Sequence, residues 1–387
     1  MLFWSIVPLL AATLAQDAQF TRESNGYWKR TTSGVVVTAP QSRLRVMTHG
    51  RIVLRGSAGD QVTYRLVERV KARTPAEAHR LLGSVSTTTR TSGDMTMLVV
   101  EPTVSPNLII ELQVNVPRYV TGAILDTQLG DVEAYDLEGS VQVNTTAGLI
   151  RCDRIRGGLI GRTGGGEIRL GKVGGAVRCI SGGGSIFVDS AGADANCQTA
   201  GGEIVVREAG GPLVLSTEGG NIQVEKAASS VEAHSAAGVI DVFQAGGRVI
   251  ADTRGGSIQV GSARGVKCES AAGTIRVKTS SGPMRISTAM GSILAELLAG
   301  THLEDSSLVA GAGDITVLIP SNLALSVMAR NDSGGNPRGI LSDFSEVRAK
   351  SFGFSRAPLV AEGSINGGGP VLRINTAAGI IYLKKLK

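Results

Sequence analysis

A glycine recurs every eighteen residues through the middle of this chain, with an aliphatic residue two positions after it. Three positions before it stands a hydroxyl residue, from Thr145 to Thr288. The glycines are Gly130, Gly148, Gly166, Gly184, Gly202, Gly220, Gly238 and Gly256, and after a one-residue deletion Gly273 and Gly291. A fixed period of about twenty residues is typical of stacked-repeat proteins, in which each repeat packs on its neighbours. The period therefore predicts a solenoid, although a chain of 387 residues could otherwise hold two or three globular domains.

Each repeat divides into two halves of about nine residues. In one repeat, Ile168 and Leu170 alternate inward and Val173 follows a turn. Val177 and Cys179 then alternate inward on the return. Because side chains of a strand point to opposite faces in turn, this pattern predicts two short strands per repeat, each with one buried face.

A hexapeptide β-helix is the alternative, since eighteen is three times six. That fold needs an aliphatic residue at every sixth position, but steps of six from Ile168 meet Gly174, and the next repeat offers Gly192 and Gln198. The column fails. The sequence therefore predicts an all-β, single-stranded β-solenoid (parallel β-helix) of about 18-residue rungs with two short strands per rung.

The glycine and hydroxyl columns flank the turn of each rung. Glycine permits tight corners where a Cβ atom would clash, and Ser or Thr can bond to backbone groups of a turn. A regular row of hydroxyls can also bind ice or sugar. Because this row adjoins the turn, we expect it to have a structural role.

The ends of the chain depart from the repeat. Residues 1–15 are uncharged and apolar with small residues at their end, as in a signal peptide, although no Lys or Arg precedes them and a retained anchor is the alternative. Residues 16–121 are expected to form a β-rich N-terminal cap with a helix near 74–85, because Thr74-Pro75-Ala76-Glu77 has the form of a capping box. Rungs are predicted over 122–318. A loop-bearing insertion and a C-terminal closing rung are predicted over 319–387.

Composition and motifs suggest neither a nucleic-acid partner nor a reactive centre. The net charge of +6 is scattered without a block of five or more Lys/Arg residues, so we expect a solvated mixed surface and no nucleic-acid binding. The four histidines are dispersed, and the four cysteines form no CxxC pair. We therefore predict no catalytic, cofactor-binding or metal-binding residues. Cys179 and Cys197 lie one rung apart, which permits a disulfide, but parallel side chains favour two core residues.

Two columns of residues are expected to point outward. One comprises Arg169, Phe187, Val205, Gln223, Asp241, Gln259 and Arg276, and the other Arg178, Asn196, Val214, Glu232, Ile250, Lys267 and Arg285. Neither column places two carboxylates on successive rungs, so paired acid–base catalysis is unsupported. Phe187 and Val205 form either a small apolar contact patch or scattered exposed residues.

The repeat strings carry a family resemblance. Strings such as Thr199-Ala200-Gly201-Gly202-Glu203-Ile204, with Ile365-Asn366-Gly367-Gly368-Gly369 and Thr376-Ala377-Ala378-Gly379-Ile380 near the end, make the chain similar to the bacterial putative adhesin family. That family is a domain of unknown function with a β-solenoid fold, and the similarity covers roughly residues 34–383. It implies adhesion at a cell surface or envelope, without naming binding residues.

These observations predict a non-enzymatic, exported β-solenoid that acts as an adhesin or as a cell-envelope scaffold or binding module. A carbohydrate-active β-helix protein, polysaccharide-binding or lyase-like, is one alternative, and a self-assembling envelope scaffold is another. The expected location is extracytoplasmic: the periplasm, the cell surface or the medium. The expected partner is an unknown surface ligand, polysaccharide or protein. Membrane contact is expected only through an uncleaved N-terminal segment.

Overall fold

The computed structural model describes residues 16–38, 42–102, 108–298, 303–333, 338–350 and 357–386, almost all of them in strands, turns or bends. The predicted signal segment 1–15 lies outside this range. The chain divides into two compact units, unit 1 (Met1–Gly184) and unit 2 (Ser185–Lys387). In both units the strands form two parallel sheets, A and B, and each rung contributes one strand to each sheet. The predicted β-solenoid with two strands per rung is confirmed.

The rungs of unit 1 extend further toward the N-terminus than the glycine series does. Sheet A contains β4 (Arg51–Ser57), β10 (Val132–Leu137), β12 (Ile150–Ile155) and β14 (Ile168–Val173). Sheet B contains β3 (Arg43–Thr48), β9 (Gly122–Thr127), β11 (Ser140–Thr145), β13 (Leu159–Thr163) and β15 (Val177–Ser181). A rung formed by β3 and β4 therefore lies inside the segment assigned above to the cap.

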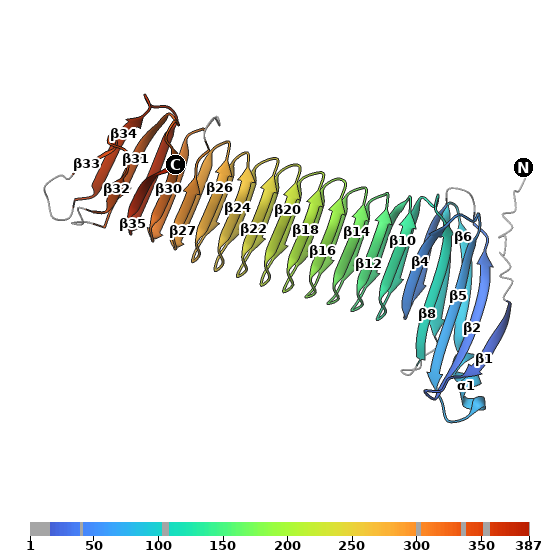
Figure 1. The fold of residues 1–387 in the computed structure, drawn as a ribbon. Coiled ribbons are helices and arrows are strands. Elements are labelled where there is room, and N and C mark those ends of the chain that lie inside the picture. Colours follow the sequence, from blue (N-terminus) through green and yellow to red (C-terminus); the bar gives the residue numbers. More distant parts are fainter. Residues whose placement is uncertain are drawn as a thin grey trace, which may run out of the picture. The chain divides into compact units, whose positions relative to one another are not determined.

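Unit 2 contains a regular series of rungs of the same kind (Figure 1). Its sheet A contains β16 (Ile186–Ala191), β18 (Ile204–Ala209), β20 (Ile222–Ala227), β22 (Ile240–Ala245), β24 (Ile258–Ala263), β26 (Ile275–Ser280), β28 (Ile293–Glu296) and β30 (Ile315–Pro320). Its sheet B contains β17 (Ala195–Thr199), β19 (Leu213–Thr217), β21 (Val231–Ser235), β23 (Val249–Thr253), β25 (Val266–Ser270), β27 (Met284–Met290) and β29 (Ser306–Ala312). Ile186, Ile204 and Ile222 pair in register and are fully buried, so they form one interior file.

The strands of sheet A differ from the expected alternation in one respect. In β14 both Gly171 and Lys172 lie away from the core, between buried Leu170 and Val173, and the strand continues through them without a turn. At the corresponding place in earlier rungs, Asp136 and Arg154 adopt positive φ angles of 62° and 56°. A backbone irregularity of this kind, close to a bulge, brings the third core residue of the strand back to the interior.

The hydroxyl column joins successive rungs through their turns. The Thr217 hydroxyl donates to the Gly202 carbonyl of the preceding rung at 2.9 Å and accepts from the Gly220 amide of its own turn at 3.1 Å. The same donation to the preceding rung recurs for Thr145, Thr163, Ser181, Ser235, Thr253, Ser270 and Thr288. These hydroxyl residues are buried. The predicted structural role of the column is therefore confirmed.

The glycine column is required by close approach between rungs. A Cβ atom at Gly238 would lie 1.9 Å from the Gly220 carbonyl oxygen, and one at Gly148 would lie 2.0 Å from that of Gly130. Such distances are far below van der Waals contact. Glycine at these positions lets neighbouring turns pack directly on one another.

Antiparallel strands extend sheet A at the N-terminal end of unit 1. β1 (Gln16–Arg22), β2 (Tyr27–Val36), β5 (Val62–Lys71) and β8 (Leu108–Pro117) pair in that order, and β8 then pairs in parallel with β4. On sheet B, β6 (Val85–Ser92) and β7 (Met95–Pro102) form a hairpin beside β3. The only helix in the described ranges, α1 (Pro75–Leu82), packs against Val70 of β5. Its N-cap Thr74 accepts a hydrogen bond from the Glu77 amide at 3.2 Å.

The C-terminal end of unit 2 is built out of sequence order. β31 (Leu325–Asn331) and β32 (Ile340–Ser342) form the outermost rung, while β35 (Val371–Ala378) lies between β29 and β31, and β36 (Ile381–Leu386) lies between β30 and β32. β34 (Leu359–Ile365) and β33 (Arg348–Lys350) then add antiparallel strands beyond β31. In the outermost rung Asn331 replaces the hydroxyl residue, and its amide donates to the carbonyls of Gly339 and Gly379, each at 2.8 Å.

Candidate functional site

The outward columns of unit 2 are mixed in chemistry. The register confirms that Phe187, Val205, Gln223, Asp241, Gln259 and Arg276 follow one another on sheet A, and Asn196, Val214, Glu232, Ile250, Lys267 and Arg285 on sheet B. Charged groups of unit 2 also form ion pairs. Lys267 pairs with Glu269 at 3.1 Å, and a ring nitrogen of His234 is hydrogen-bonded to Glu232 at 3.0 Å. These outer faces are thus partly neutralised by their own side chains.

Sheet B of unit 1 has a different outer face, which carries two hollows. The larger hollow has a volume of about 490 Å³ and is lined by Met47, Thr48, His49, Val100, Glu101, Asp126, Thr127, Gln128, Asn144, Thr145, Thr146, Arg162, Thr163, Gly164 and Ile180. The smaller hollow has a volume of about 250 Å³ and is lined by Arg43, Gly122, Ala123, Ile124, Ser140, Val141, Gln142, Gly158, Leu159, Ile160, Ala176 and Arg178. Both hollows cross several rungs on the same face. We take this face as the candidate site.

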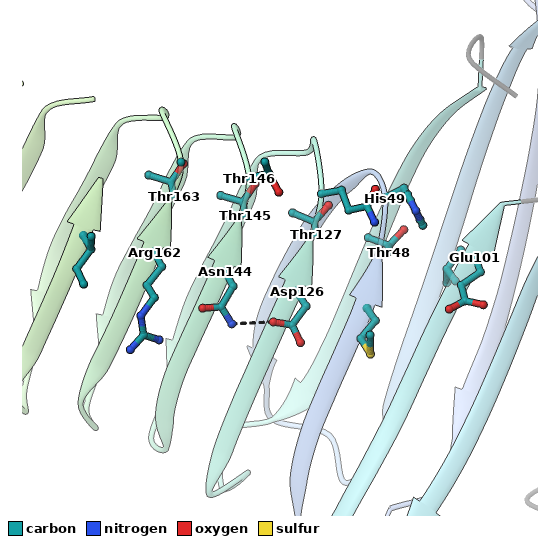
Figure 2. A pocket seen from close by; sticks show the side chains of 15 residues that line it. Thr48, His49, Glu101, Asp126, Thr127, Asn144, Thr145, Thr146, Arg162 and Thr163 are labelled. Atoms are coloured by element: carbon teal, nitrogen blue, oxygen red, sulfur yellow. Dashed lines mark hydrogen bonds between the residues drawn. The ribbon is translucent and has the colours of Figure 1, made fainter. Parts of the chain in front are cut away.

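Polar side chains form one column along the larger hollow. Met47, Asp126, Asn144, Arg162 and Ile180 are Cα partners on successive strands from β3 to β15. Figure 2 shows Asp126, Asn144 and Arg162 on neighbouring strands, with the threonines near the turn. The column therefore presents a carboxylate, an amide and a guanidinium at successive strand spacings, each of about 4.8 Å.

Asp126 is held by two partners. The guanidinium of Arg45 binds its carboxylate at 2.8 Å, and the Asn144 amide donates to it at 2.7 Å. These contacts neutralise Asp126 and fix the orientation of Asn144. The acceptor oxygen of the Asn144 amide is then left for other partners.

A second column borders the smaller hollow. Arg45, Ile124, Gln142, Ile160 and Arg178 are Cα partners on the same five strands. The hollow lies where the adjoining positions carry small residues, among them Gly122, Ser140, Gly158 and Ala176. Arginine thus stands at both ends of a column whose centre is apolar and amidic.

The titratable groups elsewhere in unit 1 serve the fold. Burial raises the pKa of the Cys152 thiol to about 12. Although burial alone would raise it, hydrogen bonds from Tyr135 and Arg51 hold the pKa of Glu133 below its usual value. Burial also raises the pKa of Glu68, against the opposing effect of Arg30, which binds it at 2.6 Å.

The thiol of Cys268 in unit 2 is likewise buried, and its pKa is raised by burial. Buried thiols with raised pKa values stay protonated at neutral pH and are poor nucleophiles. Cys179 and Cys197 are buried as well. They belong to different units, so the Cys179–Cys197 bridge and its alternative both remain predictions.

The histidines of the described residues lie in different parts of the fold. His49 lines the larger hollow, and His79 of α1 stacks on Phe20 with ring centroids 3.9 Å apart. His234 lies in β21, and His302 lies outside the described residues. Among the described residues, no cluster of three or more His, Cys, Asp or Glu side chains could hold a metal ion. The same part of the chain has no helix long and apolar enough to cross a membrane.

Sequence reasoning did not find the candidate site. The two outward columns predicted from the sequence began at Arg169 and Arg178, whereas the hollows lie mainly on β3, β9, β11 and β13. Continuing the second column backward by eighteen residues would have found Ile160, Gln142 and Ile124. No periodic signal indicates Arg45, because β3 joins β9 across a long insertion in the sequence.

Comparisons with known proteins give little functional guidance. No protein-family model matches the chain, and no curated protein matches it. Solved structures that match include a putative cell adhesion protein from Clostridium sporogenes ATCC 15579, at 9% identity over 97% of this chain and 100% of that chain, with a TM-score of 0.20. Another is a putative adhesin from Bacteroides fragilis NCTC 9343, at 12% identity over 95% of this chain and 100% of that chain, with a TM-score of 0.26. Both names fall in the class that the repeat strings resemble, and no residue role or ligand follows from such low scores.

Proposed function

We propose that this chain is a non-enzymatic binding module of the adhesin type, which uses the outer face of sheet B in unit 1 to hold an extended surface ligand outside the cytoplasm. The observation that carries the proposal is the pair of hollows that crosses successive rungs of this face. Concave sites with a few placed polar groups are where proteins most often bind ligands. The apolar start of the sequence supports export.

The rungs provide a rigid support for such a face. Parallel backbone pairing fixes β9, β11, β13 and β15 in one register, and buried hydroxyls join the turns beside them. Side chains held on a rigid element lose little freedom on binding, which favours affinity. An extended ligand that follows the rungs would repeat similar contacts at each one.

The test is retention of the purified full chain on intact cells and on immobilised polysaccharides and proteins. Ser140→Trp should fill the smaller hollow and abolish retention. Ser230→Trp is the matched control, because Ser230 precedes Val231 of β21 as Ser140 precedes Val141 of β11, and Ser230 lies in unit 2. Equal retention of both variants would refute the proposed face. Turnover of a polysaccharide by the wild-type chain would instead establish the enzyme alternative.

A further inference from the structure

The charges on the candidate face identify a class of ligand. The outward residues of the five strands are Arg43, Arg45, Met47, Ile124, Asp126, Ser140, Gln142, Asn144, Ile160, Arg162, Arg178 and Ile180. They include four arginines and one acidic residue, Asp126, which Arg45 already neutralises. Among the interactions found for the described residues, no carboxylate contacts Arg43, Arg162 or Arg178. Glu101 of β7 also lines the larger hollow, so three arginines without a carboxylate contact stand against one further carboxylate, and the face carries a net positive charge.

This arrangement contrasts with the other sheet of the same unit. On sheet A, Arg51 binds Glu133 at 2.5 Å, and Arg154 binds Asp136 at 2.6 Å. These two arginines of sheet A thus have acidic partners within the chain, whereas Arg43, Arg162 and Arg178 of the candidate face are exposed and available for an external anion. The planar guanidinium matches carboxylate and sulfate groups with two parallel hydrogen bonds.

The space between the arginines has the chemistry of a sugar-binding surface. Ile124 and Ile160 are half-buried and present aliphatic groups, against which the C–H faces of sugar rings can pack. Gln142 and Asn144 supply amides that can bond to hydroxyl groups. From Arg45 to Arg178 the column crosses four strand spacings, roughly 19 Å, which suits an extended chain rather than a single small molecule.

We infer that the ligand is an anionic polysaccharide, whose carboxylate or sulfate groups bind Arg162 and Arg178 while its rings lie over Ile160 and Gln142. The inference rests on the proposed function, because it names the ligand class of the same face. Single-stranded nucleic acid is the competing polyanion. Such binding normally uses aromatic side chains that stack on bases, and none of the outward residues of this face is aromatic.

Isothermal titration of the full chain with polygalacturonate, dextran sulfate and neutral dextran tests the inference. We expect binding of one or both charged polymers and none of neutral dextran. The affinity of the wild type for the charged polymers should fall as the salt concentration rises. The double variant Arg162→Gln/Arg178→Gln should bind them at least tenfold more weakly. Arg162→Lys/Arg178→Lys should retain part of the affinity, since it keeps the charge without the planar fork. Arg276→Gln, an exposed outward arginine of sheet A in unit 2, is the matched control and should bind as the wild type does.

Four results would overturn the inference. Equal binding of neutral dextran would show that charge does not select the ligand. A loss of affinity in Arg276→Gln as large as in the double variant would indicate diffuse attraction to a basic protein. Tighter binding of single-stranded DNA than of either charged polymer, lost in the double variant, would assign the face to nucleic acid. If cell retention fails in Ser140→Trp while no anionic polymer binds, the proposed function stands and only the ligand class is wrong.

Discussion

Thr217→Val removes one hydroxyl from the ladder that joins the turns of unit 2 while keeping the shape of the side chain. In the wild type this hydroxyl donates to the Gly202 carbonyl and accepts from the Gly220 amide. Thr217 is 3% exposed, so water does not readily replace it. The substitution therefore leaves two backbone groups of neighbouring rungs without these bonds.

The expected cost follows from those two groups. A buried donor or acceptor left unsatisfied costs about 1–3 kcal/mol. The added methyl of valine offsets less than about 1 kcal/mol by burial of apolar surface. At the middle of that range the two groups together cost about 4 kcal/mol, so after the offset we expect unit 2 to be destabilised locally by about 2–4 kcal/mol. Thr217→Ser keeps the hydroxyl and should cost only about 1 kcal/mol, consistent with serine at the same place in the rungs of Ser235 and Ser270.

Amide hydrogen exchange followed by mass spectrometry is the suitable assay, because long repeat arrays need not unfold in two states. Peptides that contain Gly220 should exchange roughly 30- to 1,000-fold faster in Thr217→Val, since each 1.4 kcal/mol corresponds to about tenfold. Ser216→Ala, on the outer face of the same strand, is the control and should change exchange little. Equal protection in Thr217→Val and Thr217→Ser would refute a stabilising role for the hydroxyl ladder.

Three further predictions concern single contacts. Gly238→Ala places a Cβ atom 1.9 Å from the carbonyl of the preceding rung and should cost about 1–3 kcal/mol or more in urea unfolding, whereas Gly219→Ala meets no atom closer than 3.8 Å and should be nearly neutral. Asp136→Asn keeps a residue suited to positive φ but removes the ion pair with Arg154 that lowers the pKa of Asp136. The free energy of unfolding of the wild type should therefore exceed that of the variant by at most about 1 kcal/mol at neutral pH. This difference should disappear as pH falls below the ordinary value of 3.8, and its persistence in acid would contradict the ion-pair explanation. Arg30→Met leaves buried Glu68 without its counter-ion and should destabilise the N-terminal strands by about 3–5 kcal/mol at neutral pH. Because burial raises the pKa of Glu68, this carboxylate should take up a proton on acidification, and the destabilisation caused by Arg30→Met should become smaller. Equal destabilisation at pH 5 and pH 8 would argue against an unpaired charge on Glu68 as its cause.

The repetitive part of the fold could be predicted because each rung repeats the same local requirements. Alternation at Ile204 and Val206 indicates a half-buried strand, and the glycine and hydroxyl columns mark the turn. Each signal recurs in ten or so rungs, so an accidental match is excluded. Packing between identical neighbours then follows from the period alone.

The ends were harder to predict because their neighbours are distant in sequence. β3 pairs with β9, which places Thr48 beside Thr127 across a long insertion that holds the helix and four strands. β35 enters between two strands that precede it, and no periodicity encodes that order. Long-range pairings of this kind depend on which free edge a strand meets.

The candidate site was missed for a related reason. Its hollows depend on small residues at Gly122 and Gly158 lying beside larger ones, and on the β6–β7 hairpin that contributes Val100 and Glu101 to the wall. None of these residues differs within its own rung in a way that would indicate a binding site. Only the register of the stacked strands brings them together.

The C-terminal strand order has a consequence for biosynthesis. The outermost rung, β31 and β32, emerges from the ribosome before β35 and β36, the strands that must lie beneath it. Addition of one coil after another during translation therefore cannot complete unit 2, because a place in both sheets must stay open until the final residues are made. Chains that stop short of residue 371 would have exposed strand edges on β29 and β31 and would be expected to aggregate.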